Sequence, residues 1–159
     1  MRLRPSSRLL VVDHLHRTLL FRFAHRRGAL AGKAFWATPG GGVDEGESFE
    51  EAASRELFEE TGTERSDVGK HVAERSFPMQ LPDGENVWAE ERYFLVRVSS
   101  DILSMEHWTS LENEVMADSH WWTLSELAAT RETVFPEDLA CMLAACGISG
   151  ENGSVSCTV

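Results

Sequence analysis

Short apolar runs separated by polar turns recur along this chain and predict several β-strands. Residues 8–13 (RLLVVD) and 18–22 (TLLFR) are rich in leucine and valine and flank a short polar turn, which favours a pair of strands. Two longer strands are predicted at 71–78 and 87–98, joined through the turn sequence Pro82-Asp83-Gly84. The chain therefore contains enough strands for a sheet, and a sheet needs another layer to cover its apolar faces.

Helix start and stop signals fall between these predicted strands. Ser48 can cap a helix N-terminus, Glu51 stands three residues later as in a capping box, and Gly62 provides a C-terminal stop. A second capping sequence precedes a short helix predicted at 124–130, and a proline in the first turn opens a last helix at 136–146. Helices interleaved with strands predict an α/β (α+β) fold.

Length and charge limit the kinds of function to consider. The chain has 159 residues, 42% of them hydrophobic, which suits one domain with a substantial core. Its formal net charge is −11, which argues against non-specific binding to a nucleic-acid backbone. An acidic protein can still act on a phosphate compound if divalent cations lie between the two negative partners.

Targeting and redox signals favour a cytoplasmic protein. The longest apolar run, Leu9–Val12, is far too short to span a bilayer, and no membrane partner is expected. The three cysteines are odd in number and show no paired zinc-binding spacing. We therefore expect a protein with reduced cysteines. The small, polar residues 147–159 predict a disordered tail after the domain.

The segment from Gly41 to Thr63 (GGVDEGESFEEAASRELFEETGT) carries the chemistry. On a helix with about 100° per residue, Glu56, Glu59 and Glu60 share one arc of roughly 100°. Carboxylates held this close repel one another. Mg²⁺ relieves such repulsion because it prefers oxygen ligands and brings its own waters. We therefore expect a magnesium site on this helix.

Neighbouring residues of the same segment complete the predicted site. Arg55 lies four residues from both Glu51 and Glu59, so we expect it to hold the carboxylate geometry by side-chain pairing, with Glu47 as a further partner. The glycines at 40–42 allow the backbone to approach closely and offer carbonyl oxygens to a metal. A metal bridged to a polyphosphate would activate a water molecule, and a glutamate could take its proton.

These residues resemble the signature of the Nudix hydrolases (MutT-like proteins), with glycine at 41, glutamate at 47 and the run R-E-L-x-E-E-x-G from 55 to 62. The resemblance implies a domain over residues 5–146 with a mixed sheet in an α/β/α sandwich. It also implies hydrolysis of a nucleoside diphosphate linked to another group, with Mg²⁺ or Mn²⁺. The family usually has an aliphatic residue where this chain has Thr63, a departure that affects the following loop.

By position, the resemblance makes Glu56, Glu59 and Glu60 the metal-binding and catalytic carboxylates, with Arg55 and Glu47 orienting them. Gly40 or Gly41 would offer a carbonyl, and Gly62 would be structural. A further acidic ligand often comes from a loop before the last strand, where Glu112 is preferred over Glu114. The general base is assigned to the glutamates jointly.

The substrate is predicted less sharply than the reaction. Pro78 lies where ADP-ribose pyrophosphatases carry a proline, which favours ADP-ribose or a nucleotide sugar. Aromatic residues that could stack a base are Trp36, Phe77, Trp88 and Tyr93. Two alternatives stay open: hydrolysis at the 5′ end of RNA, and a non-catalytic ligand-binding or regulatory module with the same fold. The expected partner is a small nucleotide, no long nucleic acid is expected, and a homodimer is left open.

Overall fold

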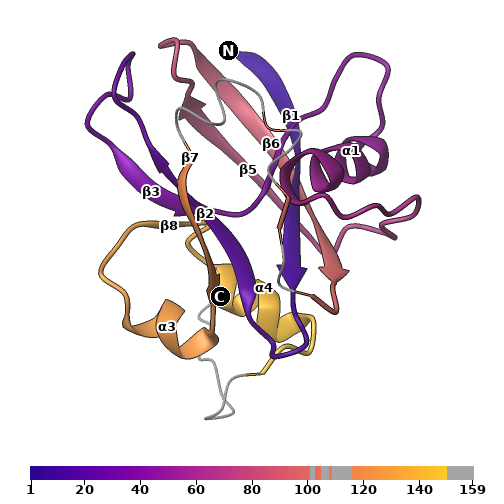
Figure 1. Ribbon diagram of the computed structural model, residues 1–159. Helices are drawn as coiled ribbons and strands as arrows, with labels where there is room; N and C mark the ends of the chain where they lie inside the picture. Colours follow the sequence, from indigo (N-terminus) through magenta and orange to yellow (C-terminus); the bar gives the residue numbers. More distant parts are fainter. Residues whose placement is uncertain (101–102, 105–107, 109–115, 150–159) are drawn as a thin grey trace.

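A computed structural model of the chain describes residues 1–100, 103–104, 108 and 116–149. Its centre is a curled mixed sheet with α1 on one face and α3 and α4 on the other (Figure 1). The predicted α+β fold with helices on both sides of a mixed sheet is confirmed.

Strands and helices alternate along the described part of the chain. The strands are β1 (Arg2–Val12), β2 (Thr18–Ala24), β3 (Ala34–Ala37), β4 (Gly40–Gly42), β5 (Ala73–Gln80), β6 (Asn86–Arg97), β7 (Met116–Trp122) and β8 (Val134–Phe135). The helices are α1 (Phe49–Thr61), α3 (Leu124–Ala129) and α4 (Leu139–Ala145).

The sheet divides into two halves around β1 and β2. The strand order is β5-β6-β1-β2-β3-β8, with β4 also paired to β1 and β7 also paired to β2. β1 runs parallel to β6 along its whole length, whereas β1 and β2 pair only at Val12 and Thr18 beside their connecting turn. Because β2 diverges from β1, the free edge of β1 can pair with β4, which brings the glycines 40–42 against Ser6, Ser7 and Arg8.

Alternating side chains divide the interior into two apolar clusters. Leu9, Val11 and Phe94 point toward α1, where they pack against Ala53 and Leu57. The opposite face carries other apolar side chains of the same strands and is covered by α4; this cluster includes Leu10, Val12, Tyr93, Trp122, Leu139 and Leu143. Full burial of a leucine or phenylalanine is worth about 1.5–3 kcal/mol, so these contacts hold α1 firmly on the sheet.

Local signals fix both ends of α1. The Ser48 hydroxyl accepts a hydrogen bond from the Glu51 backbone N–H at 3.0 Å, as expected for an N-cap. At the other end Gly62 adopts a left-handed conformation (φ 79°) and donates its backbone N–H to the Phe58 carbonyl. The helix predicted from these caps is present, and it presents its glutamates at a defined position on the sheet.

Some boundaries differ from the predictions. β1 begins at Arg2 rather than residue 8, because parallel pairing with β6 supplies hydrogen bonds that the polar sequence did not signal. α4 begins three residues later than predicted, at Leu139. Ile148 is 3% exposed and packs in the core, so packing continues past the predicted boundary at 146. Residues 150–159 of the expected tail lie outside the described residues.

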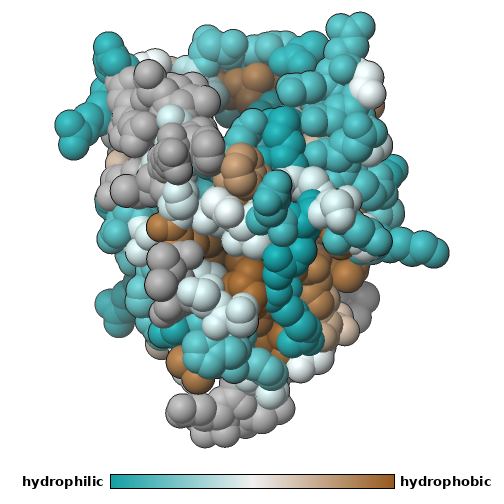
Figure 2. All heavy atoms as spheres, turned by 45° about the vertical axis from the view of Figure 1, so that its right-hand side comes forward, coloured by the Kyte–Doolittle hydropathy of each residue, from teal (hydrophilic) through white to brown (hydrophobic). Residues whose placement is uncertain are grey.

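Surface and cysteine features complete the description. The face shown in Figure 2 is mostly hydrophilic, with apolar side chains visible in separate places between charged ones. Among the described helices, none has the length and apolar character needed to cross a membrane.

Cys141 is disulfide-bonded and Cys146 is free, so the expectation of entirely reduced cysteines is not met.

Candidate active site

The glycine strand β4 lies directly against the second half of α1. The Gly40 backbone N–H donates to Glu60 Oε2 at 3.0 Å. A Cβ atom on Gly41 would lie 2.5 Å from Glu56 Oε1. Only glycine allows the buried carboxylates to come this close to the loop backbone, so the predicted close approach at 40–42 is present.

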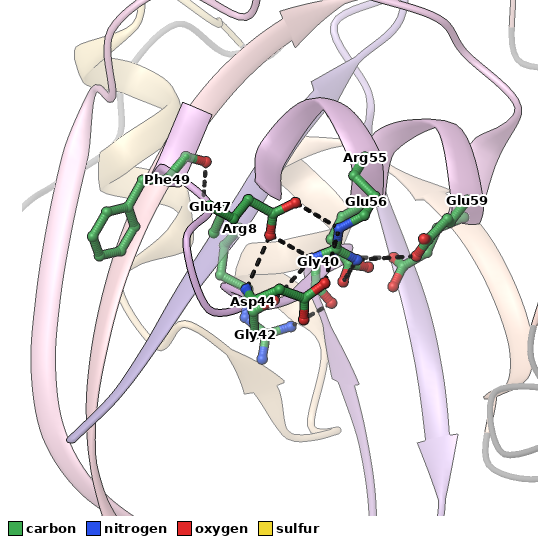
Figure 3. A network of polar contacts seen from close by, with 11 residues as sticks. Arg8, Gly40, Gly42, Asp44, Glu47, Phe49, Arg55, Glu56 and Glu59 are labelled. Atoms are coloured by element: carbon green, nitrogen blue, oxygen red, sulfur yellow. Dashed lines mark hydrogen bonds and ion pairs between the residues drawn. The ribbon is translucent and has the colours of Figure 1, made fainter. Parts of the chain in front are cut away.

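Arg55 is the centre of the polar network where β4 meets α1 (Figure 3). Its Nε and Nη2 donate to the two carboxylate oxygens of Glu47 at 2.8 and 2.9 Å. Its Nη1 donates to Glu56 at 3.0 Å and to Glu59 at 3.3 Å. Nη2 also donates to the Gly42 carbonyl at 3.0 Å. One guanidinium therefore ties the loop, the residue before the helix and two helix carboxylates together.

The expected pairing of Arg55 needs one refinement. Helical spacing predicts Glu51 and Glu59 as the partners of Arg55 on the helix, with Glu47 as a further partner. Glu47 makes the two shortest contacts because the loop 42–47 folds back over α1. Asp44 adds an ion pair at 3.6 Å and donates its backbone N–H to Glu47. These loop contacts are not visible from helical spacing.

Burial and charge shift the protonation of the network. The hydrogen bonds from Arg55 hold the pKa of Glu47 below its ordinary value, and Glu47 in turn raises the pKa of Arg55. Burial raises the pKa of Glu56, against the opposing effect of Arg55. The neighbouring Glu59 carboxylate raises the pKa of Glu56 further, because two like charges on one helix face repel each other.

The donor set fits a hard divalent cation. Glu56 and Glu60 are buried and adjacent, Glu59 is partly exposed at the rim, and the Gly40–Gly42 backbone lies opposite them. Within the described ranges, no three His, Cys, Asp or Glu side chains are gathered closely enough to form a ready metal cage. Mg²⁺ does not need such a cage, because it is usually held by one or two carboxylates and keeps several waters.

The aromatic residues proposed for base stacking are mostly unsuited to that role. Tyr93 is 1% exposed and Trp36 is 6% exposed, so both belong to the core and present no free ring face. Their burial corrects the prediction, since an aromatic side chain looks the same in sequence whether it packs or binds. Trp88 is exposed and donates to the Ser76 hydroxyl at 2.6 Å. Phe77 is half-buried with the Arg75 guanidinium over its ring.

The acidic residues expected to add a metal ligand, Glu112 and Glu114, lie outside the described residues. The structure adds polar groups that the sequence did not single out. Arg8 on β1 donates to Glu91 on β6 at 3.1 Å and to the Gly40 carbonyl at 3.3 Å. These partners are separated by 83 and 32 positions, and no local pattern joins them.

Comparisons with known proteins agree with this geometry. A sequence model of the NUDIX domain matches residues 3–143. An RNA pyrophosphohydrolase from Vibrio cholerae is 28% identical over 116 residues, which cover 65% of this chain and 67% of that protein. The chain spans 60–67% of the length of the curated relatives that it matches over 116 residues.

Two solved structures share the fold. The MutT protein from Methanosarcina mazei Go1 superposes with a TM-score of 0.64 at 22% identity, covering 90% of this chain and 91% of that one. The NUDIX domain of Shewanella oneidensis NrtR, complexed with ADP ribose, superposes with a TM-score of 0.62 at 18% identity. The superposition covers 92% of this chain and 87% of that one. The chain therefore belongs to the Nudix family.

Proposed function

We propose that the protein catalyses Mg²⁺-dependent hydrolysis of a nucleoside diphosphate linked to another group, releasing a nucleoside monophosphate and a phosphorylated remainder. The observation that carries this proposal is the Arg55-centred cluster. In it, Glu47, Glu56 and Glu59 contact one guanidinium beside the glycine strand β4, called the glycine loop below. A bound divalent cation would neutralise substrate phosphates and favour ionisation of the attacking water.

The protein groups would then have separate roles. Glu56, Glu59 and Glu60 would hold the cation, and the glutamates jointly are the candidates for accepting the proton of the attacking water. Arg55 acts on the carboxylates rather than on the substrate, because its contacts are already directed at them and at Gly42. Glu47 holds Arg55 in place by a bidentate pair.

A cationic position next to the glycine loop supports a phosphate-rich substrate. Arg4 lies on the same face of β1 as Arg8, and its Nη2 is 3.6 Å from where a Cβ on Gly42 would lie. Its hydrogen bond goes to the Ser6 hydroxyl at 2.8 Å rather than to a carboxylate. Burial lowers the pKa of Arg4, and Arg8 lowers it further. An anion beside these two guanidinium groups would relieve their repulsion.

The test is substitution of single glutamates on α1. Glu59→Gln and Glu60→Gln should reduce kcat by about 10²–10⁴-fold, as loss of a general base or of metal charge does. Glu50→Gln on the exposed first turn of the same helix is the matched control and should stay near wild type. Circular dichroism would show that each variant remains folded. Near-wild-type turnover of both site variants would falsify the assignment.

Two substrate classes follow from different observations. An ADP-ribose or nucleotide-sugar substrate is favoured by Pro78, which lies exposed on the edge strand β5. The 5′ end of RNA is favoured by the name of the curated relatives. The net charge of −11 restricts such an RNA substrate to a short end held in the site.

A direct competition separates the two classes. The purified protein would receive ADP-ribose, a nucleotide sugar, a dinucleotide and a short RNA carrying a 5′ triphosphate, each at equal concentration with Mg²⁺. The preferred class is the one with the highest kcat/KM, and RNA length should matter little if only its end is held. Ligand binding without product in every case would instead support the regulatory module.

A further inference from the structure

A buried chain of polar groups lies on the face of the sheet that α1 does not cover. The Tyr93 hydroxyl donates to Glu91 Oε1 at 2.6 Å, and Arg8 Nε donates to Glu91 Oε2 at 3.1 Å. The side chains of Arg8 and Glu91 are only 17% and 7% exposed. A buried ion pair contributes little net stability, because desolvation offsets its attraction. Its presence beside the glycine loop therefore calls for another explanation.

The free end of Arg8 reaches the same residue that Glu60 holds. Arg8 Nη1 donates to the Gly40 carbonyl at 3.3 Å, while the Gly40 N–H donates to Glu60 Oε2 at 3.0 Å. Burial by itself would lower the pKa of Arg8, but nearby acidic groups raise it, with Glu91 the largest and Glu60 among them. The guanidinium and the Glu60 carboxylate thus both contact the backbone of Gly40 and lie within electrostatic reach of each other.

We propose that Glu91, held by Tyr93, is a positioning residue that tethers the Arg8 cation to the Gly40 carbonyl and keeps it from pairing with Glu60. If Arg8 were released from Glu91, Glu60, which already contacts the same residue, would offer its charge another acidic partner. An arginine paired with Glu60 would compete with the divalent cation for the same carboxylate. This inference rests on the proposed metal site at the glutamates.

The tether predicts a change in metal affinity rather than in stability alone. Mn²⁺ binding to the metal-free protein would be measured by isothermal titration calorimetry. Stability would be measured separately, as the Tm of thermal unfolding in the presence of a chelator. Glu91→Gln keeps the size of the side chain but removes the charge that holds Arg8. It should weaken Mn²⁺ binding about tenfold, the lower end of what residues that orient metal ligands typically contribute. The double variant Arg8→Gln/Glu91→Gln, which lacks the released cation, should recover to within about threefold of wild type.

A matched control exists at the start of β1, where Arg2 pairs with Glu85 in the turn before β6. Arg2 and Glu85 form a bidentate pair at 2.9 Å, but this pair is exposed. Glu85→Gln should therefore leave Mn²⁺ affinity unchanged. If Glu91→Gln does not fold, Arg8→Gln alone replaces it, and this variant should bind Mn²⁺ at least as tightly as wild type.

Three results would each overturn the inference. The first is a folded Glu91→Gln protein with Mn²⁺ affinity within twofold of wild type, and the second is a double variant that binds no better than Glu91→Gln. The third is weaker Mn²⁺ binding by Arg8→Gln alone. The proposed function has its own test in the same titration, because Glu60→Gln should then abolish most Mn²⁺ binding. Failure of that variant to weaken binding removes the metal site itself, whatever Glu91 does.

Discussion

Replacing Arg55 by methionine tests whether one guanidinium holds the candidate site together. Methionine keeps a long apolar side chain with good helix propensity but removes the charge and every donor. The change would leave Glu47 and Glu56 without their cation, and these side chains are only 15% and 10% exposed. The two bonds to Glu47 are both shorter than 3.0 Å, so the loop should separate from α1.

The expected loss can be bounded from burial. Breaking a fully buried ion pair by removing one partner costs about 3–5 kcal/mol. The Arg55 side chain is 27% exposed, so water can replace part of the interaction, and we expect a loss of about 2–4 kcal/mol in the free energy of unfolding. For a domain of this size the corresponding fall in Tm is roughly 5–15 °C.

Urea and thermal unfolding at neutral pH in chelator would measure this loss. Arg2→Met is the control, since Arg2 also forms a bidentate pair with a glutamate, Glu85, but both side chains are exposed (55% and 40%). Exposed pairs contribute at most about 1 kcal/mol. An Arg55→Met protein within about 0.5 kcal/mol of wild type, or no less stable than Arg2→Met, would refute the reasoning.

Three further predictions follow from the same region. Gly41→Ala places a Cβ 2.5 Å from Glu56 Oε1 without a strained backbone angle, so steady-state assays should show about 10–100-fold lower kcat with little change in Tm. Ser48→Ala removes the N-cap hydrogen bond and should cost about 1 kcal/mol in urea unfolding, with kcat nearly unchanged. The pKa of Glu47 is held below its ordinary value of about 4.5. Its pairing with Arg55 therefore stabilises the protein above that pH and is lost as the pH falls through the lower folded value. Unfolding at pH 5 and pH 3 should show this loss in wild type and a smaller one in Arg55→Met.

Sequence reasoning placed the candidate carboxylates on one face of a helix because their relations are local. The carboxylates at 56, 59 and 60 follow the helix period, and Ser48 and Gly62 mark the ends of that helix within the same short segment. Neighbouring residues of β6 also follow the strand period: Tyr93 joins one apolar cluster and Phe94 the other.

Relations between distant segments were missed for a physical reason. Arg8 meets Glu91 only because β1 and β6 are parallel neighbours, and a strand pairing of this kind leaves no periodic signal. The start of β1 contains arginine, proline and serine rather than an apolar run. Burial of Trp36 and Tyr93 likewise depends on α4 covering that face, and this packing arises from the far end of the chain.

Two acidic residues of α1 lie at the end of the helix where negative charge is disfavoured. Glu59 and Glu60 lie in the last turn, which contains no basic residue, and the partial negative charge of the helix C-terminus disfavours carboxylates there. A divalent cation bound by them would offset that dipole as well as the side-chain charges. Loading the site would therefore stiffen the final turn of α1, and the helix itself would respond to the presence of magnesium.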